Sequence, residues 1–83
     1  MRNPSNSDRA YWALMACREF GKHTGQDTEG ELEDIIGDLL ANLMHLCDQE
    51  EIEFDDMVED GRMHHTAEYA EENYEKLKKA EGE

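Results

Sequence analysis

The longest periodic run of apolar residues lies in the middle of the chain, in the segment TEGELEDIIGDLLANLMHLCD at positions 28–48. Its apolar positions recur at steps of three and four, which places them on one stripe of an α-helix. They are Leu32, Ile35, Ile36, Leu39, Leu40, Leu43, Leu46 and Cys47. The stretch from Thr28 to Glu31 has the form of a capping box, so we expect a helix over about 29–48. Gly37 costs this helix about 1 kcal/mol relative to alanine, which favours a close approach by another helix as compensation.

Two further helices are predicted on either side of this one. The first covers about 8–23, with Ser7 as the N-cap and Gly25 as the left-handed residue after its end. Its inward stripe is Ala10, Ala13, Leu14, Cys17 and Phe20. The third covers about 54–80, with Ile52 or Phe54 packed on the core at its start and Glu53 or Asp55 as alternative caps. Its apolar stripe changes face midway, so it is either one long helix or two helices broken near His64.

These patterns predict an all-α fold, a small three-helix domain made of a helical hairpin and a long or broken third helix. We expect a flexible N-terminus over 1–6, a single helical domain over 7–80 and a tail over 81–83. Hydrophobic residues are only 37% of the chain, and 83 residues are close to the smallest size that a single core can stabilise. A homodimer that completes the burial of the second or third helix is therefore one hypothesis.

Charge narrows the functional classes. The formal net charge is −14, from 22 acidic and 8 basic residues, which disfavours direct binding to nucleic acid or to an anionic membrane. No apolar run approaches the length of a membrane span, and the first ten residues lack the apolar core of a secretory signal. We therefore expect a cytosolic protein in which Cys17 and Cys47 are most simply two buried thiols; one disulfide between helices is the alternative.

Acidic residues are concentrated where the second helix is expected to give way to the third. No lysine or arginine occurs between His23 and Gly61, and carboxylates this close repel one another. This suggests a surface that binds a protein with a basic face; the alternative is a solvated acidic surface that keeps the chain soluble. The candidate partner-binding residues are Glu50, Glu51, Glu53, Asp55, Asp56, Glu59 and Asp60. No cofactor and no metal site is expected, because no established metal-binding motif is present.

The piece ELEDIIGDLLANL resembles the second acidic helix of the MazG-type nucleotide pyrophosphohydrolases. This resemblance implies a rival function, a Mg²⁺-dependent nucleotide hydrolase that uses Asp34 and Asp38. The sequence departs from the family at Ile35, where the family has a glutamate. The adjacent glutamates of the family's preceding helix are also missing, so half of the cation site is absent.

A broader resemblance covers about Glu31 to Glu68. The pattern DLLANLMHLCD, then IEFDD, then RMHHTAE is similar to short uncharacterised helical proteins of bacterial plasmids and phages. It implies a bacterial or phage accessory protein. Together with the acidity, it suggests a non-catalytic inhibitor that mimics the charge of nucleic acid, as small anti-CRISPR and anti-restriction proteins do. A structural helical protein without any site is the third reading.

Overall fold

The computed structural model describes residues 4–25 and 31–80 and shows three helices connected in chain order. They are α1 (Asn6–Thr24), α2 (Leu32–Glu50) and α3 (Phe54–Ala80). The prediction of an all-α fold is confirmed. Of the two possibilities for the third helix, the structure has the continuous one. The capping box expected from Thr28 lies outside the described residues.

The start of α1 differs from the prediction. Ser5, and not Ser7, is the N-cap: its Oγ accepts a hydrogen bond from the Asp8 backbone N–H at 3.1 Å. The Asp8 carboxylate accepts one from the Ser5 backbone N–H at 3.0 Å, which completes a capping box. Ser5 has an acidic residue three positions later and Ser7 does not, so only Ser5 can form this reciprocal pair. At the other end, Gly25 adopts the expected left-handed conformation, with φ 74°.

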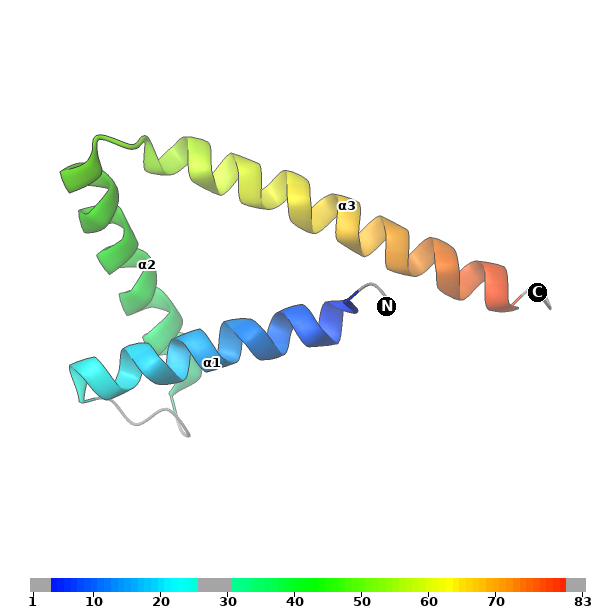
Figure 1. The fold of residues 1–83 in the computed structure, drawn as a ribbon, viewed down its shortest axis with the longest axis horizontal. Coiled ribbons are helices and arrows are strands. Elements are labelled where there is room, and N and C mark those ends of the chain that lie inside the picture. The colour runs from blue at the N-terminus through cyan, green and yellow to red at the C-terminus, as the bar shows by residue number, and fades with distance from the viewer. Residues whose placement is uncertain (1–3, 26–30, 81–83) are drawn as a thin grey trace.

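The three helices form an open triangle and not a bundle (Figure 1). The consecutive helices α1 and α2 contact each other, but α2 crosses α1 and continues away from it to meet α3. The Cα radius of gyration is 16.3 Å, whereas a compact chain of this length has about 12 Å. The helices therefore pack against one another over parts of their length, and much of each helix has no neighbour.

The buried core is correspondingly small. Among the described residues, the buried ones are Cys17 and Gly21 on α1 and Ile35 and Cys47 on α2, and Ile35 alone is fully covered, at 0% exposed. Both cysteines are free thiols, as expected.

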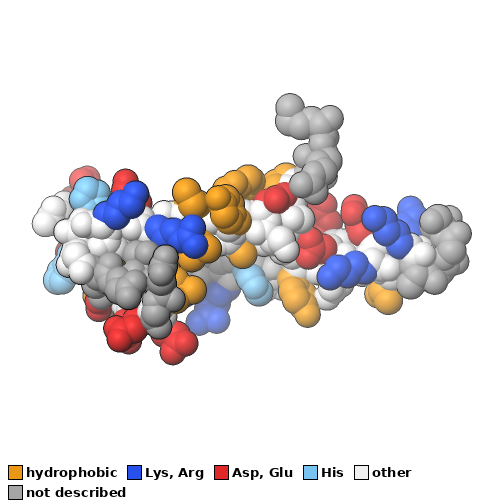
Figure 2. Space-filling model, turned by 90° about the horizontal axis from the view of Figure 1, so that it is seen from below, with side chains coloured by type: hydrophobic (Ala, Val, Ile, Leu, Met, Phe, Trp, Pro, Cys, Tyr) orange, Lys and Arg blue, Asp and Glu red, His pale blue; other side chains and the backbone are white. Residues whose placement is uncertain are grey.

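Many large hydrophobic side chains remain exposed, and Figure 2 shows some of them uncovered in the middle of one face. Gly37 does not have the close neighbour that the sequence favoured: a Cβ placed there would meet nothing within 4 Å. On α2 the exposed large side chains are Leu32, Ile36, Leu40, Leu43, Met44 and Leu46. The helix that was expected to be the core of the domain therefore has only two buried residues, and six of its large apolar side chains are exposed.

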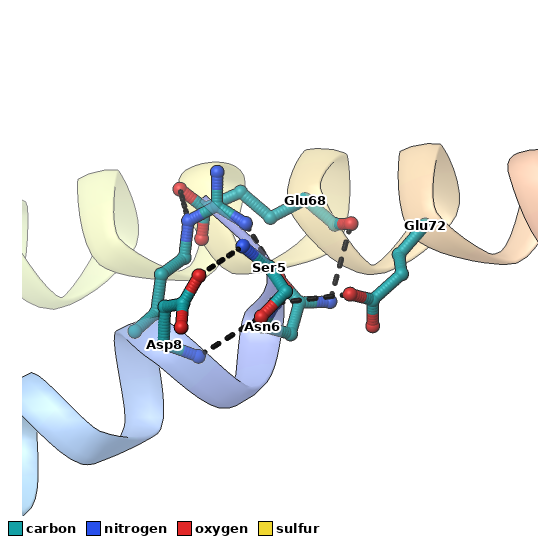
Figure 3. A network of polar contacts seen from close by, with 6 residues as sticks. Ser5, Asn6, Asp8, Glu68 and Glu72 are labelled. Carbon is teal, nitrogen blue, oxygen red and sulfur yellow. Dashed lines mark hydrogen bonds and ion pairs between the residues drawn. The ribbon is translucent and has the colours of Figure 1, made fainter. Parts of the chain in front are cut away.

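A polar network joins the start of α1 to the middle of α3 (Figure 3). The backbone N–H of Asn6 donates to Glu72 Oε1 at 3.0 Å, and the Asn6 side-chain amide donates to the Glu68 carbonyl at 3.3 Å. Arg9 forms an ion pair with the Glu68 carboxylate at 3.2 Å and donates to the Asn6 side chain at 2.8 Å. The first N–H groups of a helix lack intrahelical partners and attract anions. Glu72 meets that requirement from the other helix and thereby closes the triangle.

Replacing Ile35 by alanine should remove the only fully buried side chain among the described residues. The expected cost is about 2–5 kcal/mol, which is comparable with the whole stability of a chain this small, so the variant should lose cooperative thermal unfolding by circular dichroism. The matched control is Ile36→Ala, the same substitution at the next position, where the side chain is 44% exposed. Equal losses in the two variants would contradict the burial described here.

Candidate interaction surface

The seven predicted acidic residues lie together where α2 gives way to α3, and we call this group the acidic vertex. Glu50 ends α2, Glu51 and Glu53 lie in the connection, and Asp55 and Asp56 belong to the first turn of α3. Glu59 and Asp60 follow one turn later. All seven side chains are exposed, and the vertex is one corner of the triangle in Figure 1. The seven predicted residues therefore lie on one exposed corner of the structure. They lie close together there because they are close together in the sequence.

The backbone of the vertex turns at Glu51, which has φ 59° and ψ 40°. Among the described residues, Glu51 is the only non-glycine residue with positive φ. Its N–H bonds to the Asp48 carbonyl at 3.4 Å, and the N–H of Ile52 bonds to the Cys47 carbonyl at 2.9 Å. These bonds satisfy two of the last carbonyls of α2. Glycine usually occupies such a position, because a side chain there costs about 1–2 kcal/mol.

The helix ends act in opposite directions on the charges of the vertex. Asp55 and Asp56 lie in the first turn of α3, where the helix dipole stabilises negative charge. Glu50 lies in the last turn of α2, where the dipole disfavours negative charge, and that turn contains no basic residue. Asp55 and Asp56 therefore contribute to helix stability, whereas Glu50 opposes it.

Exposed apolar side chains lie among the carboxylates of the vertex, and their exposure was not predicted from the sequence. Ile52 and Met57 are 44% and 45% exposed, whereas Phe54 and Val58 are half-buried and hold the start of α3 against the rest of the chain. Of the two residues expected to pack at this point, Phe54 does so and Ile52 does not. The vertex thus combines an acidic rim with apolar contact area, as binding surfaces on proteins commonly do.

The carboxylates of the rival hydrolase hypothesis lie elsewhere. Asp34 and Asp38 are exposed on the first half of α2. Within residues 4–25 and 31–80, no group of three or more histidine, cysteine, aspartate or glutamate side chains is arranged to hold a metal ion.

Comparisons with known proteins do not add a family to this description: no protein-family model, no curated protein and no solved structure matches the chain significantly. Within the described part of the chain, none of the helices has the length and apolar character needed to cross a membrane.

Replacing Glu51 by glycine should stabilise the protein, because glycine adopts φ 59° without the steric cost of a Cβ. We expect a gain of about 0.5–1 kcal/mol after the larger backbone entropy of glycine in the unfolded chain is subtracted, measured as a higher melting temperature. Glu51→Gln is the control, since it removes the same charge but keeps the Cβ. If Gln stabilised the protein as much as Gly, charge repulsion and not backbone strain would be the cost at this position.

Proposed function

We propose that this protein is a non-catalytic interaction protein that presents the acidic vertex to a basic surface of a protein partner. The observation that carries the proposal is the exposure of seven carboxylates on one corner of the fold, in a stretch without lysine or arginine from position 24 to 61. Such a surface attracts a basic partner over long range and orients it as it approaches.

Two residues of the vertex lower the stability of the folded chain, and this supports the proposal. Glu51 has a backbone conformation that a glycine would adopt more easily, and Glu50 faces the unfavourable end of a helix dipole. A chain selected for stability alone has inexpensive alternatives at both positions. Strained positions are often found where function requires them, and here both of the residues concerned carry a negative charge.

The exposed apolar residues that lie among the vertex carboxylates supply binding affinity that charge alone does not provide. Rim charges mainly set the rate of encounter and the salt dependence, while buried apolar contacts at the centre of an interface contribute most of the affinity. Ile52 and Met57 are exposed at the vertex. Helix α2, which ends at the vertex (Figure 1), carries further exposed aliphatic side chains. The partner surface that fits is therefore basic at its edge and apolar at its centre.

Nucleic-acid-handling proteins are the partner class that we propose, because their binding grooves are basic by necessity. The protein would then act as a charge mimic that occupies such a groove, in the manner of phage- or plasmid-encoded inhibitors. The free thiols of Cys17 and Cys47 are consistent with a cytosolic site of action. The proposal requires no cofactor and no catalytic residue.

Reversing three charges of the vertex should abolish partner binding without unfolding the protein. The variant is Glu53→Lys, Asp56→Lys and Glu59→Lys. The control is Glu31→Lys, Glu33→Lys and Asp34→Lys, which makes the same change in net charge at exposed positions at the other end of α2. Immobilised protein is incubated with a bacterial lysate at low and at high salt, and the retained proteins are identified by mass spectrometry.

A partner of the proposed kind is held by the wild type and the control at low salt, released at high salt, displaced by added DNA, and bound at least about tenfold less by the vertex variant. Retention by the vertex variant equal to that of the control would refute the role of the vertex. Circular dichroism of all three proteins verifies that the helices are intact.

A further inference from the structure

The outer side of α3 carries a second apolar stripe that is exposed to solvent. Its members are spaced alternately by four and three residues, the spacing of the seam of a two-stranded coiled coil. They are Met63, Ala67, Ala70, Tyr74 and Leu77, and we call them the outer stripe. All five are exposed, and the three large side chains are 65%, 66% and 65% exposed.

The outer stripe faces away from the contacts that α3 makes with α1. Those contacts are made by Glu68 and Glu72, and Ala70 is two positions from each, which is about 200° around an α-helix. Figure 1 also shows that α3 continues past the start of α1, so its last turns have no neighbouring helix. A partner can therefore cover the outer stripe without disturbing the polar network.

The amount of uncovered surface is large enough for a stable interface. The accessible surface is 7222 Å², whereas a compact protein of 9.6 kDa exposes about 5,100 Å². The excess of about 2,100 Å² exceeds the roughly 800 Å² per partner that a standard interface buries. The chain as a whole thus exposes more surface than an interface of standard size would cover.

The charged residues around the outer stripe indicate which partner can bind there. Residues 61–80 contain as many basic as acidic residues, so the whole net charge of −14 lies outside this segment. The residues are Arg62, Lys76, Lys78 and Lys79 against Glu68, Glu71, Glu72 and Glu75. Two copies can meet here without net repulsion, whereas α2 has five acidic residues and no lysine or arginine and would repel its own copy.

From these observations we infer that the protein is a homodimer in which the outer stripes of two α3 helices pack against each other. The copies run antiparallel, because a parallel pair would place the three lysines of one copy beside the same lysines of the other. Ala67 and Ala70, at the middle of the stripe, let the two backbones approach closely, while the larger side chains fill the space on either side. With these alanines at the centre of the pair, the last lysines of one α3 lie close to Glu59 and Asp60 of the second copy.

The test is sedimentation velocity of the full chain at concentrations up to the order of 100 µM, where an interface of micromolar affinity is occupied. The wild type should sediment as a species of twice the 9.6 kDa chain mass. Ala67→Glu with Ala70→Glu should sediment as a monomer, because burying the new carboxylates raises the dissociation constant by more than about 100-fold. Glutamate is a good helix former, so this variant keeps its helical circular dichroism.

The matched control is His65→Glu with Tyr69→Glu, which adds two carboxylates to the other side of the same helix and should remain a dimer. A variant with Glu51→Lys and Glu53→Lys, vertex residues that precede α3, should also remain a dimer, so failure of this inference and failure of the proposed function are distinguishable. A monomeric wild type, or equal dimerisation of the stripe variant and its control, would overturn the inference.

The relative orientation of the two α3 helices is tested by a separate measurement. In an antiparallel pair the two copies of residue 77 are many residues apart along the seam, well beyond the Cα separation of about 7 Å that a disulfide can span. Leu77→Cys should therefore form no disulfide-linked dimer on mild oxidation, and the buried Cys17 and Cys47 should stay unlinked. A linked Leu77→Cys dimer would show that the helices are parallel.

Discussion

The structure depends most on the crossing of α1 and α2, where Ile35 is the single fully buried large side chain of the described residues. Two small residues of α1, Cys17 and Gly21, are the buried positions on the other helix. Burial of one isoleucine and its neighbours contributes a few kcal/mol at most, on the scale of about 1.5–3 kcal/mol for each large aliphatic side chain. Ordering the 65 residues of the three helices costs far more than that. The contacts that we propose between two copies of α3 would add to this small core.

The polar network between α1 and α3 illustrates how the fold holds its shape with so little apolar contact. Glu72 occupies the helix N-terminus of α1, where a carboxylate is favoured, and Arg9 holds Glu68 beside it. Both interactions are partly exposed, so each contributes little by itself. Their geometric effect is that they join the start of α1 to the middle of α3. The outer stripe and the acidic vertex both remain exposed to solvent.

Much of the secondary structure could be predicted from the sequence, since helices are encoded by local spacing. The apolar period located all three helices, and Gly25 marked the end of α1 because a left-handed residue is needed there. The arrangement of the helices could not be predicted in the same way. Asn6 and Glu72 are 66 positions apart, and no local pattern indicates that they meet. The open side of Gly37 was also missed, because a glycine in a helix does not reveal whether a neighbour is present.

For the candidate site, too, the sequence predicted what depends on neighbouring residues and missed what depends on tertiary packing. Seven acidic residues were recognised from a charge run, and a short connection between helices is enough to keep them together. The conformation of Glu51 was not foreseen, since the connection contains no glycine and a left-handed glutamate is uncommon. The exposure of Ile52 and Met57 depends on which residues of the connection pack inward, and Phe54 occupies that position. The stability cost and the apolar part of the vertex thus emerged only from the three-dimensional structure.

The most direct test of this account is the dependence of the melting temperature on protein concentration, followed by circular dichroism over about a hundredfold range. If a second copy supplies contacts that a single chain lacks, unfolding is coupled to dissociation and the melting temperature rises with concentration. A melting temperature that is the same at every concentration, with a sharp cooperative transition, would mean that the three helices are stable alone. In that case the small core at Ile35 would be sufficient, and the central claim would be wrong.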